Sequence, residues 1–467
     1  MSSSSSPPYR RGVPLVLACR FVGLGVLAVS FSVSCSLKVD RDKLAALGAL
    51  CDGGVCGDAA VPSAGCRSGC WDDVALACLP GTSNVACGRE GAACTACEAP
   101  TGLCAEGLCV AQNAILALSA SAGHTCMADS AFNLWCWGQN DRGQLGLELG
   151  SPGTDRPQIS ATGSWKDVSA GGDAQAHTCA IHFQGSLWCW GDNSRGQAGA
   201  NPSEVPFSSR VRLLDPGGWA RVSVGPLASC AVRDQGTLWC WGAGDDGRLG
   251  FEGGSDRPGV VGTEADWRDV SVGDGFSCAL KDDNSLYCWG RNDRGQVGRS
   301  DVGAVTSRPA FVTANVLSVA AGGSHACGVR TGNSVWCWGD NAQGQSAETR
   351  ELPFVPSPRR LAFGIAPEPQ WRQVAAGVGH SCAVSADGQL WCWGRNDEGQ
   401  IGIGAASTLP SPPVRIARER GWRRVAVGAR HTCAEAADGT LWCWGDGRLG
   451  QTGVAPPLTP IPVRVTF

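Results

Sequence analysis

Fourteen cysteines in the last three-quarters of the chain recur as seven pairs, each with its members ten positions apart. Paired cysteines can form disulfides or hold a metal ion, so they are the first candidates for chemistry. A zinc site needs four converging ligands, whereas each of these segments supplies two. The spacing therefore predicts disulfides rather than metal sites: Cys126–Cys136, Cys179–Cys189, Cys230–Cys240, Cys278–Cys288, Cys327–Cys337, Cys382–Cys392 and Cys433–Cys443.

Five of the six histidines stand two residues before a repeat cysteine. They are His124, His177, His325, His380 and His431. Histidine is a common metal ligand and acid–base catalyst, but equivalent positions of different repeats lie far apart. We therefore expect each to make the same local hydrogen bond in its own repeat, and His182, outside the pattern, to be exposed. No metal or cofactor site is predicted.

The residues between each cysteine pair predict a β-hairpin. In the sixth copy Cys382 then faces Cys392, and Ala386-Asp387-Gly388 forms a three-residue loop. Such a loop ends in a left-handed residue, which favours Gly or Asn. That position holds Gly185, Gly236, Asn284, Asn333, Gly388 and Gly439. Phe132 is the exception, and there we expect Asn133 to take over with a shifted turn.

Two further strands precede each hairpin, one opened by Trp, as in Trp165–Gly171, and an earlier one opened by Pro, as in Pro412–Ile416. Four short strands in each repeat of about 50 residues predict an all-β, seven-bladed propeller. The first hairpin has no proline-opened strand before it, and Pro460–Phe467 is left over at the end. We therefore expect the C-terminal strand to join the first blade and close the ring.

Tryptophans recur in the Trp-Cys-Trp-Gly segment that ends each hairpin, with Tyr287 as the one replacement. A carbohydrate platform is one interpretation of so many tryptophans. Their recurrence at fixed strand positions favours packing instead, with the Trp pair of one blade against the disulfide face of the next.

Two segments carry a resemblance to a known family: Gly377-Val-Gly-His380-Ser-Cys-Ala383, and the run from Leu390 to Gly402. With their counterparts in the other copies, they resemble the regulator-of-chromosome-condensation repeat over about residues 113–467. The resemblance implies a seven-bladed β-propeller used for protein–protein contact. The paired cysteines depart from the pattern of the family's intracellular members.

The N-terminal region predicts export. Arginines precede a 14-residue apolar run, Phe21–Ser34, of the length of a signal-peptide core, and Cys35 follows it as in a bacterial lipoprotein. We predict a signal peptide at 1–34, lipidation of Cys35, a tether at 35–50 and a Cys-rich disulfide stalk at 51–110, before a propeller at 113–467. Ordinary cleavage near Ser32 and Ser34, or an uncleaved anchor, are the alternatives. Lipidation leaves an even number of cysteines, ten of them in the stalk.

For function, we expect a non-enzymatic binding module of the cell envelope or extracellular space, monomeric and lipid-anchored to a membrane. An unknown protein is the expected partner, an acidic one if the arginine turns described below form a basic arc, and a polysaccharide is the next. A net charge of −4 argues against nucleic acid. The alternatives are a secreted or periplasmic lyase or hydrolase using the central pocket and, by family analogy, guanine-nucleotide exchange. No catalytic motif is found.

The candidate binding rim consists of arginines in the turns after the Trp-Cys-Trp-Gly segments and two phenylalanines of the insertion at 346–370. These residues are Arg142, Arg195, Arg248, Arg294, Arg448, Phe354 and Phe363. Equivalent turns share one face of a propeller, so the arginines could form a basic arc for an acidic partner. The alternative is that each forms a local pair with an aspartate, such as Asp141 with Arg142.

The hairpin prediction can be tested by counting thiols. Freshly purified, denatured protein treated with a thiol reagent should show no modified cysteine between residues 126 and 443, because all fourteen sulfurs are expected to be oxidised. The same protein reduced before labelling is the control and should show fourteen. Fourteen labelled cysteines without prior reduction would contradict both the disulfides and export.

Overall fold

The computed structural model describes residues 114–467 except 149, 206, 213–216, 347–351 and 456, together with short paired strands between Leu50 and Ala111. Of strand β16, Phe207–Arg212, only the backbone is described. None of the described residues belongs to a helix long and apolar enough to cross a membrane.

The chain divides into two compact units, Met1–Cys97 with Glu106–Leu108, and Glu98–Ala105 with Cys109–Phe467. In the Cys-rich region the structure describes eight short strands, which form two-stranded pairs. These are β1 (Leu50–Cys51) with β2 (Gly54–Val55), β3 (Cys70–Asp72) with β4 (Ala77–Leu79), β5 (Thr82–Ser83) with β6 (Ala86–Cys87), and β7 (Gly102–Ala105) with β8 (Leu108–Ala111). The predicted signal peptide, Cys35, the tether and the disulfides of the stalk lie outside the described residues.

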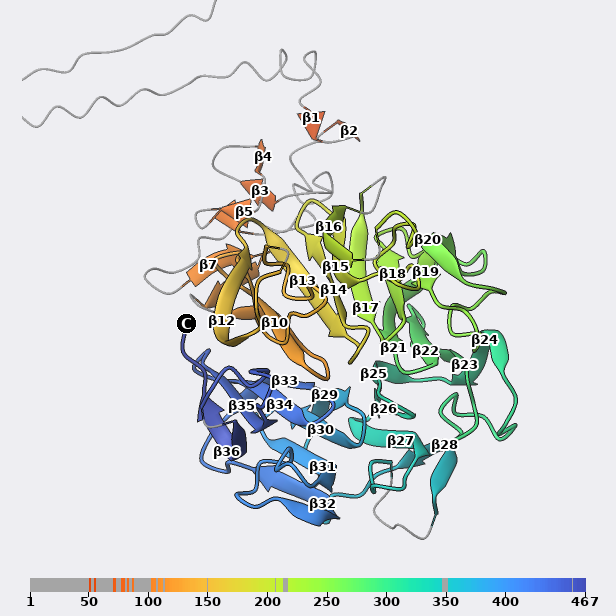
Figure 1. Ribbon diagram of the computed structural model, residues 1–467, viewed down its shortest axis with the longest axis vertical. Coiled ribbons are helices and arrows are strands. Elements are labelled where there is room, and N and C mark those ends of the chain that lie inside the picture. The colour runs from red at the N-terminus through yellow and green to blue at the C-terminus, as the bar shows by residue number, and fades with distance from the viewer. Residues whose placement is uncertain are drawn as a thin grey trace, which may run out of the picture. The chain divides into compact units, whose positions relative to one another are not determined.

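From Ile115 onward the chain forms seven four-stranded antiparallel sheets, the blades, arranged as a ring with colours running from orange to blue (Figure 1). Each blade uses four consecutive strands in the order inner, second, third and outer. Blade 1 consists of β9 (Ile115–Ala120), β10 (His124–Asp129), β11 (Leu134–Gly138) and β12 (Thr154–Ala161). Blade 2 consists of β13 (Trp165–Gly171), β14 (His177–His182), β15 (Leu187–Asp192) and β16. Blade 3 consists of β17 (Trp219–Val224), β18 (Ala228–Arg233), β19 (Leu238–Gly242) and β20 (Ser255–Val260).

Blades 4 to 7 repeat this order. Blade 4 consists of β21 (Trp267–Val272), β22 (Phe276–Lys281), β23 (Leu286–Gly290) and β24 (Thr306–Thr313), and blade 5 of β25 (Val316–Ala321), β26 (His325–Arg330), β27 (Ser334–Asp340) and β28 (Phe354–Arg360). Blade 6 consists of β29 (Trp371–Ala376), β30 (His380–Ser385), β31 (Leu390–Asn396) and β32 (Ser407–Ile416). Blade 7 consists of β33 (Trp422–Val427), β34 (His431–Ala436), β35 (Leu441–Asp446) and β36 (Leu458–Arg464). The all-β, seven-bladed prediction is confirmed.

The predicted hairpin register is confirmed. Cys382 pairs with Cys392 and Val384 with Leu390, and all seven cysteine pairs face each other as disulfides. The prediction for the first hairpin is wrong, because Phe132 itself takes the left-handed conformation, with φ of 66°. Its ring meets Phe183 of the next blade edge-on at 5.0 Å, a contact that compensates for the unfavourable backbone.

The predicted closure by strand exchange is also wrong. The C-terminal strand β36 pairs with β35 inside the seventh blade, and the first blade takes all four of its strands from residues 115–161. The error came from assigning each proline-opened strand to the hairpin after it, whereas the strand pairs with the hairpin before it. Antiparallel neighbours joined by a short connection pair most readily, which favours this sequential order.

Prolines in the outer strands protect the exposed edges of the blades. Pro157, Pro258 and Pro309 lie within β12, β20 and β24, and the outer strands of blades 5, 6 and 7 contain prolines as well. Proline has no backbone N–H to offer an incoming strand, so it is tolerated at an edge and discourages sheet extension.

Each blade interface joins a disulfide to a tryptophan. Between blades 1 and 2, Cys126 and Cys136 pack in one cluster with Trp165 and Trp190. The predicted contact between Trp and a disulfide is confirmed, but its predicted direction is wrong, because the disulfide belongs to the earlier blade and the tryptophans to the following one. The second Trp of each segment is fully buried, and the first is only partly buried in most blades.

The seam between blades 7 and 1 has its own ionic contact. Glu435, buried at 1 % exposure, occupies a position that is aliphatic in the other six blades. It pairs with Arg424 at 2.9 Å and accepts a 3.5 Å hydrogen bond from the N–H of Ile115, while Arg424 donates to the carbonyl of Leu116 at 2.5 Å. Burial raises the pKa of Glu435, opposed by Arg424. The pair fastens the first strand of the ring to its last blade.

Residues after β36 seal the seam by packing. Val465 is 2 % exposed in a cluster with Ile115 and Trp137 of blade 1, and the Phe467 ring lies 5.5 Å from that of Trp135. The C-terminus therefore does contact the first blade, through side chains rather than through a strand.

We expect the double substitution V465A/F467A to lower the free energy of unfolding by about 2–3 kcal/mol, because it removes a buried apolar contact and an aromatic pair at the seam. Chemical denaturation without reductant measures this. T466A, at an exposed residue between the two, is the matched control. Equal stability of the double variant and the control would show that the last three residues do not close the ring.

Candidate functional site

A repeated hydrogen-bond relay links the second strand of five blades to the next blade. The ring nitrogen Nε2 of His124 contacts Thr178 Oγ1 at 2.8 Å, and this hydroxyl donates to the backbone carbonyl of Gln144 at 2.8 Å. The same carbonyl accepts the indole N–H of Trp190 at 2.9 Å. Further His–hydroxyl contacts are His177–Ser229, His325–Ser381, His380–Thr432 and His431–Thr125, at 2.7–2.8 Å.

The relay fixes the protonation of the histidines. A hydroxyl has one proton, and in the relay it goes to the carbonyl, so the Nε2 atom must be the donor. Burial lowers the pKa of His124, His325 and His380 to about 3 and that of His177 and His431 to about 4, and so keeps each ring neutral. The hydrogen bond recurs as predicted, but the prediction that it is local to one repeat is wrong, because its partner lies in the next blade. His182 was predicted to be exposed; it is half-buried and its ring contacts that of Trp165.

The relay is interrupted at two interfaces, and at one of them both partners are lost together. Blade 4 has Phe276 in the histidine position, and the corresponding hydroxyl position of blade 5 is Ala326. Blade 3 has Ala228 in the histidine position, and Ser277 still donates to a carbonyl, that of Arg248. A buried histidine without a hydroxyl partner would leave a polar nitrogen unsatisfied, which explains the paired loss.

The predicted arc of five equivalent arginines is wrong. In each of six blades a glutamine Oε1 accepts the N–H of the residue two positions earlier, and this marks the equivalent position. Arg142, Arg195 and Arg294 occupy it, but in blade 7 it is Leu449. Arg448 therefore comes one residue too early. Arg248 stands in the glutamine position, because its carbonyl accepts the Trp289 indole.

Local ion pairs engage four of these arginines. Arg142 lies 3.9 Å from both Asp141 and Asp192, Arg195 pairs with Asp245, Arg248 with Asp246 at 2.5 Å, and Arg448 with Asp446 and Glu398. Arg248 is also buried, at 4 % exposure. The alternative of local pairing therefore describes these arginines better than a basic arc.

We call the end of the ring that carries these turns (for example 139–146 and 395–406) the turn face, and the end that carries the hairpin loops (for example 130–133 and 386–389) the hairpin face. Carboxylates outnumber cations in the described turn-face loops. The carboxylates are Asp141, Glu148, Asp173, Glu204, Asp245, Asp246, Glu252, Asp274, Asp293, Asp301, Asp397 and Glu398; the cations are Arg142, Arg195, Arg248, Arg291, Arg294, Arg299, Arg430 and Arg448.

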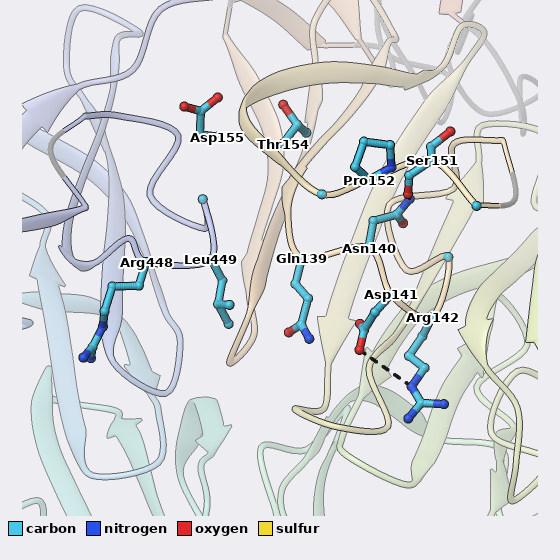
Figure 2. Close-up of a pocket in the computed structure, with 14 residues that line it drawn as sticks. Gln139, Asn140, Asp141, Arg142, Ser151, Pro152, Thr154, Asp155, Arg448 and Leu449 are labelled. Atoms are coloured by element: carbon cyan, nitrogen blue, oxygen red, sulfur yellow. Dashed lines mark hydrogen bonds and ion pairs between the residues drawn. The ribbon is translucent and has the colours of Figure 1, made fainter.

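An open groove of about 870 Å³ crosses the turn face at the seam. Figure 2 shows Asp141 and Arg142 of blade 1 on one side and Arg448 and Leu449 of blade 7 on the other. The dashed ion pair joins Asp141 to Arg142. With both arginines held by carboxylates, the groove is a mixed polar surface rather than a charged receptor.

The mouth of the central channel on the turn face has a volume of about 540 Å³ and is lined mainly by glycine, alanine and backbone. Close packing requires glycine there: a Cβ on Gly377 would lie 2.1 Å from the carbonyl oxygen of Gly428. The lining includes the carboxylates of Asp173, Asp274 and Asp340 but no histidine, cysteine or lysine. Among the described residues, no group of three His, Cys, Asp or Glu side chains could hold a metal ion.

The phenylalanines of the insertion do not join the arginines. Phe363 lies on the hairpin-face side of its blade and is 5 % exposed, with its ring 4.2 Å from that of Trp371. It is therefore a core residue, and its prediction as a binding residue is wrong. Phe354 begins β28 and is half-buried at the other end of the blade.

Residues of the hairpin face were missed by the sequence reasoning. Arg372, Arg423 and Arg424 surround the single carboxylate of Glu435, and all belong to blades 6 and 7. The signal in the sequence was an acidic residue in an otherwise aliphatic position, close to a run of five arginines in residues 415–424.

Two family models and several known proteins match this chain. A family model described as RCC1-like domain matches residues 204–466, and one described as Regulator of chromosome condensation (RCC1) repeat matches residues 165–197. The Ultraviolet-B receptor UVR8 of Arabidopsis thaliana is 38% identical over 116 residues, 24% of this chain and 25% of the relative. E3 ubiquitin-protein ligase HERC2 of Mus musculus is 28% identical over 353 residues, 73% of this chain and 6% of the relative.

The chain thus spans a quarter or less of the length of these curated relatives. Among solved structures, Prp20p of Saccharomyces cerevisiae, described with its binding properties to Gsp1p and histones, covers 76% of this chain and 88% of its own at 23% identity, with a TM-score of 0.64. Human WBSCR16 covers 69% and 87% at 23% identity, with a TM-score of 0.62. These structural likenesses concern the fold alone.

The neutral histidines of the relay predict that the folded protein becomes less stable in acid. The unfolded chain protonates its histidines near pH 6.5 and the folded chain only near pH 3–4, so stability is full above pH 6.5 and falls below it. Each histidine contributes up to about 1.4 kcal/mol per pH unit across that window. H380A, which places in blade 6 the alanine that blade 3 has at Ala228, should be less stable at pH 8 and should lose stability less steeply below pH 6.5 by about one proton.

Denaturation at a series of pH values measures the slope, and H182A, outside the relay, is the control, with a smaller expected change. Buried carboxyls of raised pKa, such as Asp167 at about 6, act in the opposite direction but are common to all variants. An unchanged slope in H380A would show that the relay histidine is not held neutral.

Proposed function

The chain belongs to the RCC1-like domain family, and on that premise we propose that it is a non-enzymatic binding module of the cell envelope, in which a disulfide-stapled propeller holds a protein partner. The activities for which its relatives are named, such as ubiquitin ligation, belong to much longer proteins, of which this chain matches only a small part. Prp20p, whose named binding partners are proteins, supports a partner of the same class.

One observation carries the choice of binding over catalysis: the side chains that recur from blade to blade are used to hold the blades together. The relay histidines are neutral and donate to hydroxyls, the paired cysteines are oxidised, and the second tryptophans are buried against them. A general acid or base needs a pKa near the working pH and access to substrate. The two faces and the outer strands remain available, and these are surfaces for recognition.

The disulfides support a place outside the cytoplasm. All fourteen cysteines of the ring are fully buried and paired, and such disulfides form in oxidising compartments. The apolar run Phe21–Ser34 followed by Cys35 supports export with a lipid anchor, so that the ring would stand at the periplasmic or outer-membrane surface. A polysaccharide of the same compartment remains the second ligand class.

The test is capture with the oxidised full chain. Immobilised protein, incubated with a native envelope extract, should retain one protein in a saturable complex that persists at a fixed ratio in size-exclusion chromatography. Chain that has been reduced, alkylated and unfolded is the control and should retain none. Turnover of glycans or peptides without a retained protein would overturn the proposal in favour of an enzyme.

The proposed lipid anchor has a separate test, which uses the mature N-terminal peptide. Mass spectrometry should find an acylated Cys35, and C35S should move the protein from the membrane fraction to the soluble one. An unmodified Cys35, or a retained Phe21–Ser34 segment, would remove the anchor from the proposal without affecting the binding role.

A further inference from the structure

Arginines gather on the hairpin face of blades 5, 6 and 7. The strand registers place them there: Arg360, Arg415 and Arg464 each pair with the first Trp of the third strand, next to the hairpin loop. We define the arginine face as Arg359, Arg360, Arg372, Arg415, Arg418, Arg420, Arg423, Arg424 and Arg464.

The carboxylates of the same region are fewer: Glu368, Asp387, Glu419, Asp438 and Glu435. Glu435 is shared, lying 2.9 Å from Arg424 and 3.8 Å from Arg423. Glu368 pairs with Arg360 at 2.8 Å. A chain with a net charge of −4 therefore carries an excess of positive charge here, on the face opposite to the acidic turn face.

Arg372 shows that this charge is not balanced within the fold. Its guanidinium donates to the carbonyls of Trp422 and Arg423 rather than to a carboxylate. Burial and the positive charges of Arg424 and Arg423 lower its pKa, and Glu435 compensates only in part. Like charges held together at a cost to the free protein are relieved by an anionic ligand.

The guanidiniums are also held in place. Arg420 stacks on the ring of Trp442 at 3.8 Å, Arg415 donates to the carbonyl of Arg418 at 3.5 Å, and Arg372 is tied to the next blade as described. Planar guanidiniums in fixed positions suit carboxylates, which they bind through two parallel hydrogen bonds. Ordering them before binding reduces the entropy lost on association.

A groove with a mixed polar and apolar lining adjoins the arginine face. It has a volume of about 530 Å³, lies at the seam on the hairpin face, and is lined by Ile115, Met127, Trp135, Arg464 and Phe467 among others. Phe467 is 58 % exposed at its edge. Two aspartates also line the groove: Asp129 accepts the indole N–H of Trp135 at 2.7 Å, and Asp438 accepts the N–H of Thr440 at 3.0 Å, contacts that orient the carboxylates without neutralising them.

We propose that the arginine face and this groove together dock a carboxylate-rich polypeptide segment of the partner, with an apolar side chain of the segment in the groove. The inference rests on the proposed function and names the surface and the chemistry of its ligand. A polypeptide fits because it combines spaced carboxylates with a single large apolar side chain. A sulfated polysaccharide offers anions without that side chain.

The probe is a synthetic fluorescein-labelled peptide with one Phe flanked on each side by four Glu residues, titrated against the oxidised full chain by anisotropy. We expect binding at 50 mM NaCl that weakens steeply at 300 mM, because exposed charges are screened. R372Q/R423Q and the more exposed R418Q/R464Q should each weaken binding about tenfold. R257Q/R308Q, two exposed arginines in the outer strands of blades 3 and 4 and outside the arginine face, is the matched control and should bind like the native chain.

Replacement of the Phe of the peptide by Ser tests the groove, and it should weaken binding by a further several-fold. Dextran sulfate and vesicles containing phosphatidylglycerol form the other arms. Either of them binding more tightly than the peptide, with the same dependence on the arginines, would overturn the polypeptide assignment. Equal binding by all variants, or none at 50 mM NaCl, would overturn the site.

The partner captured from the envelope extract separates this inference from the proposed function. If R372Q/R423Q and R418Q/R464Q retain it as well as the native chain does, the binding module stands and the arginine face is not its docking surface. If the peptide binds through the arginine face but no protein is ever retained, the proposed function fails while the anion-binding surface remains.

Discussion

The structure depends on a hydrogen-bond acceptor that recurs in every blade: the backbone carbonyl of the residue at the glutamine position. It receives the indole N–H of the buried tryptophan of the next blade and, in six of the interfaces, a hydroxyl proton as well, as at Gln144 with Trp190 and Thr178. A buried carbonyl with both lone pairs occupied is fully satisfied, so the polar contact costs little in a dry interface. Because donor and acceptor belong to different blades, the bond specifies how blades follow one another.

The disulfides stabilise single blades, whereas these hydrogen bonds join neighbouring blades. Each disulfide closes a loop of about eleven residues within one blade and stabilises it by about 2.7 kcal/mol on a chain-entropy account, without linking blades. The ring is therefore covalently reinforced within blades and closed only by packing, hydrogen bonds and the Glu435–Arg424 pair. The seam between blades 7 and 1 is the one place where no chain connection helps, and there a buried ion pair and the apolar residue Val465 replace it.

Sequence alone was sufficient for the fold class, the blade number and the hairpin register, because these follow from local periodicity and from cysteines that must face each other. It failed where the answer depended on contacts between distant residues. Phe132 takes a backbone conformation that its type disfavours because Phe183 of the next blade supports it. The proline-opened strands could pair with the hairpin on either side, and periodicity is identical for the two assignments. Arg248 and Arg448 look equivalent to Arg142 until the glutamine hydrogen bonds fix the alignment.

Charge is distributed along the axis of the ring in a way that composition conceals. A net charge of −4 suggested a weakly acidic surface, yet the arginines divide into two kinds. The arginines of the turn face mostly form ion pairs with neighbouring aspartates, so their charge is neutralised locally, as in the pair of Arg195 with Asp245. Those around Glu435 share one carboxylate and donate to backbone carbonyls, which do not neutralise them. Recognition of an acidic ligand requires uncompensated charge rather than a count of arginines, and this criterion selects the hairpin face over the turn face.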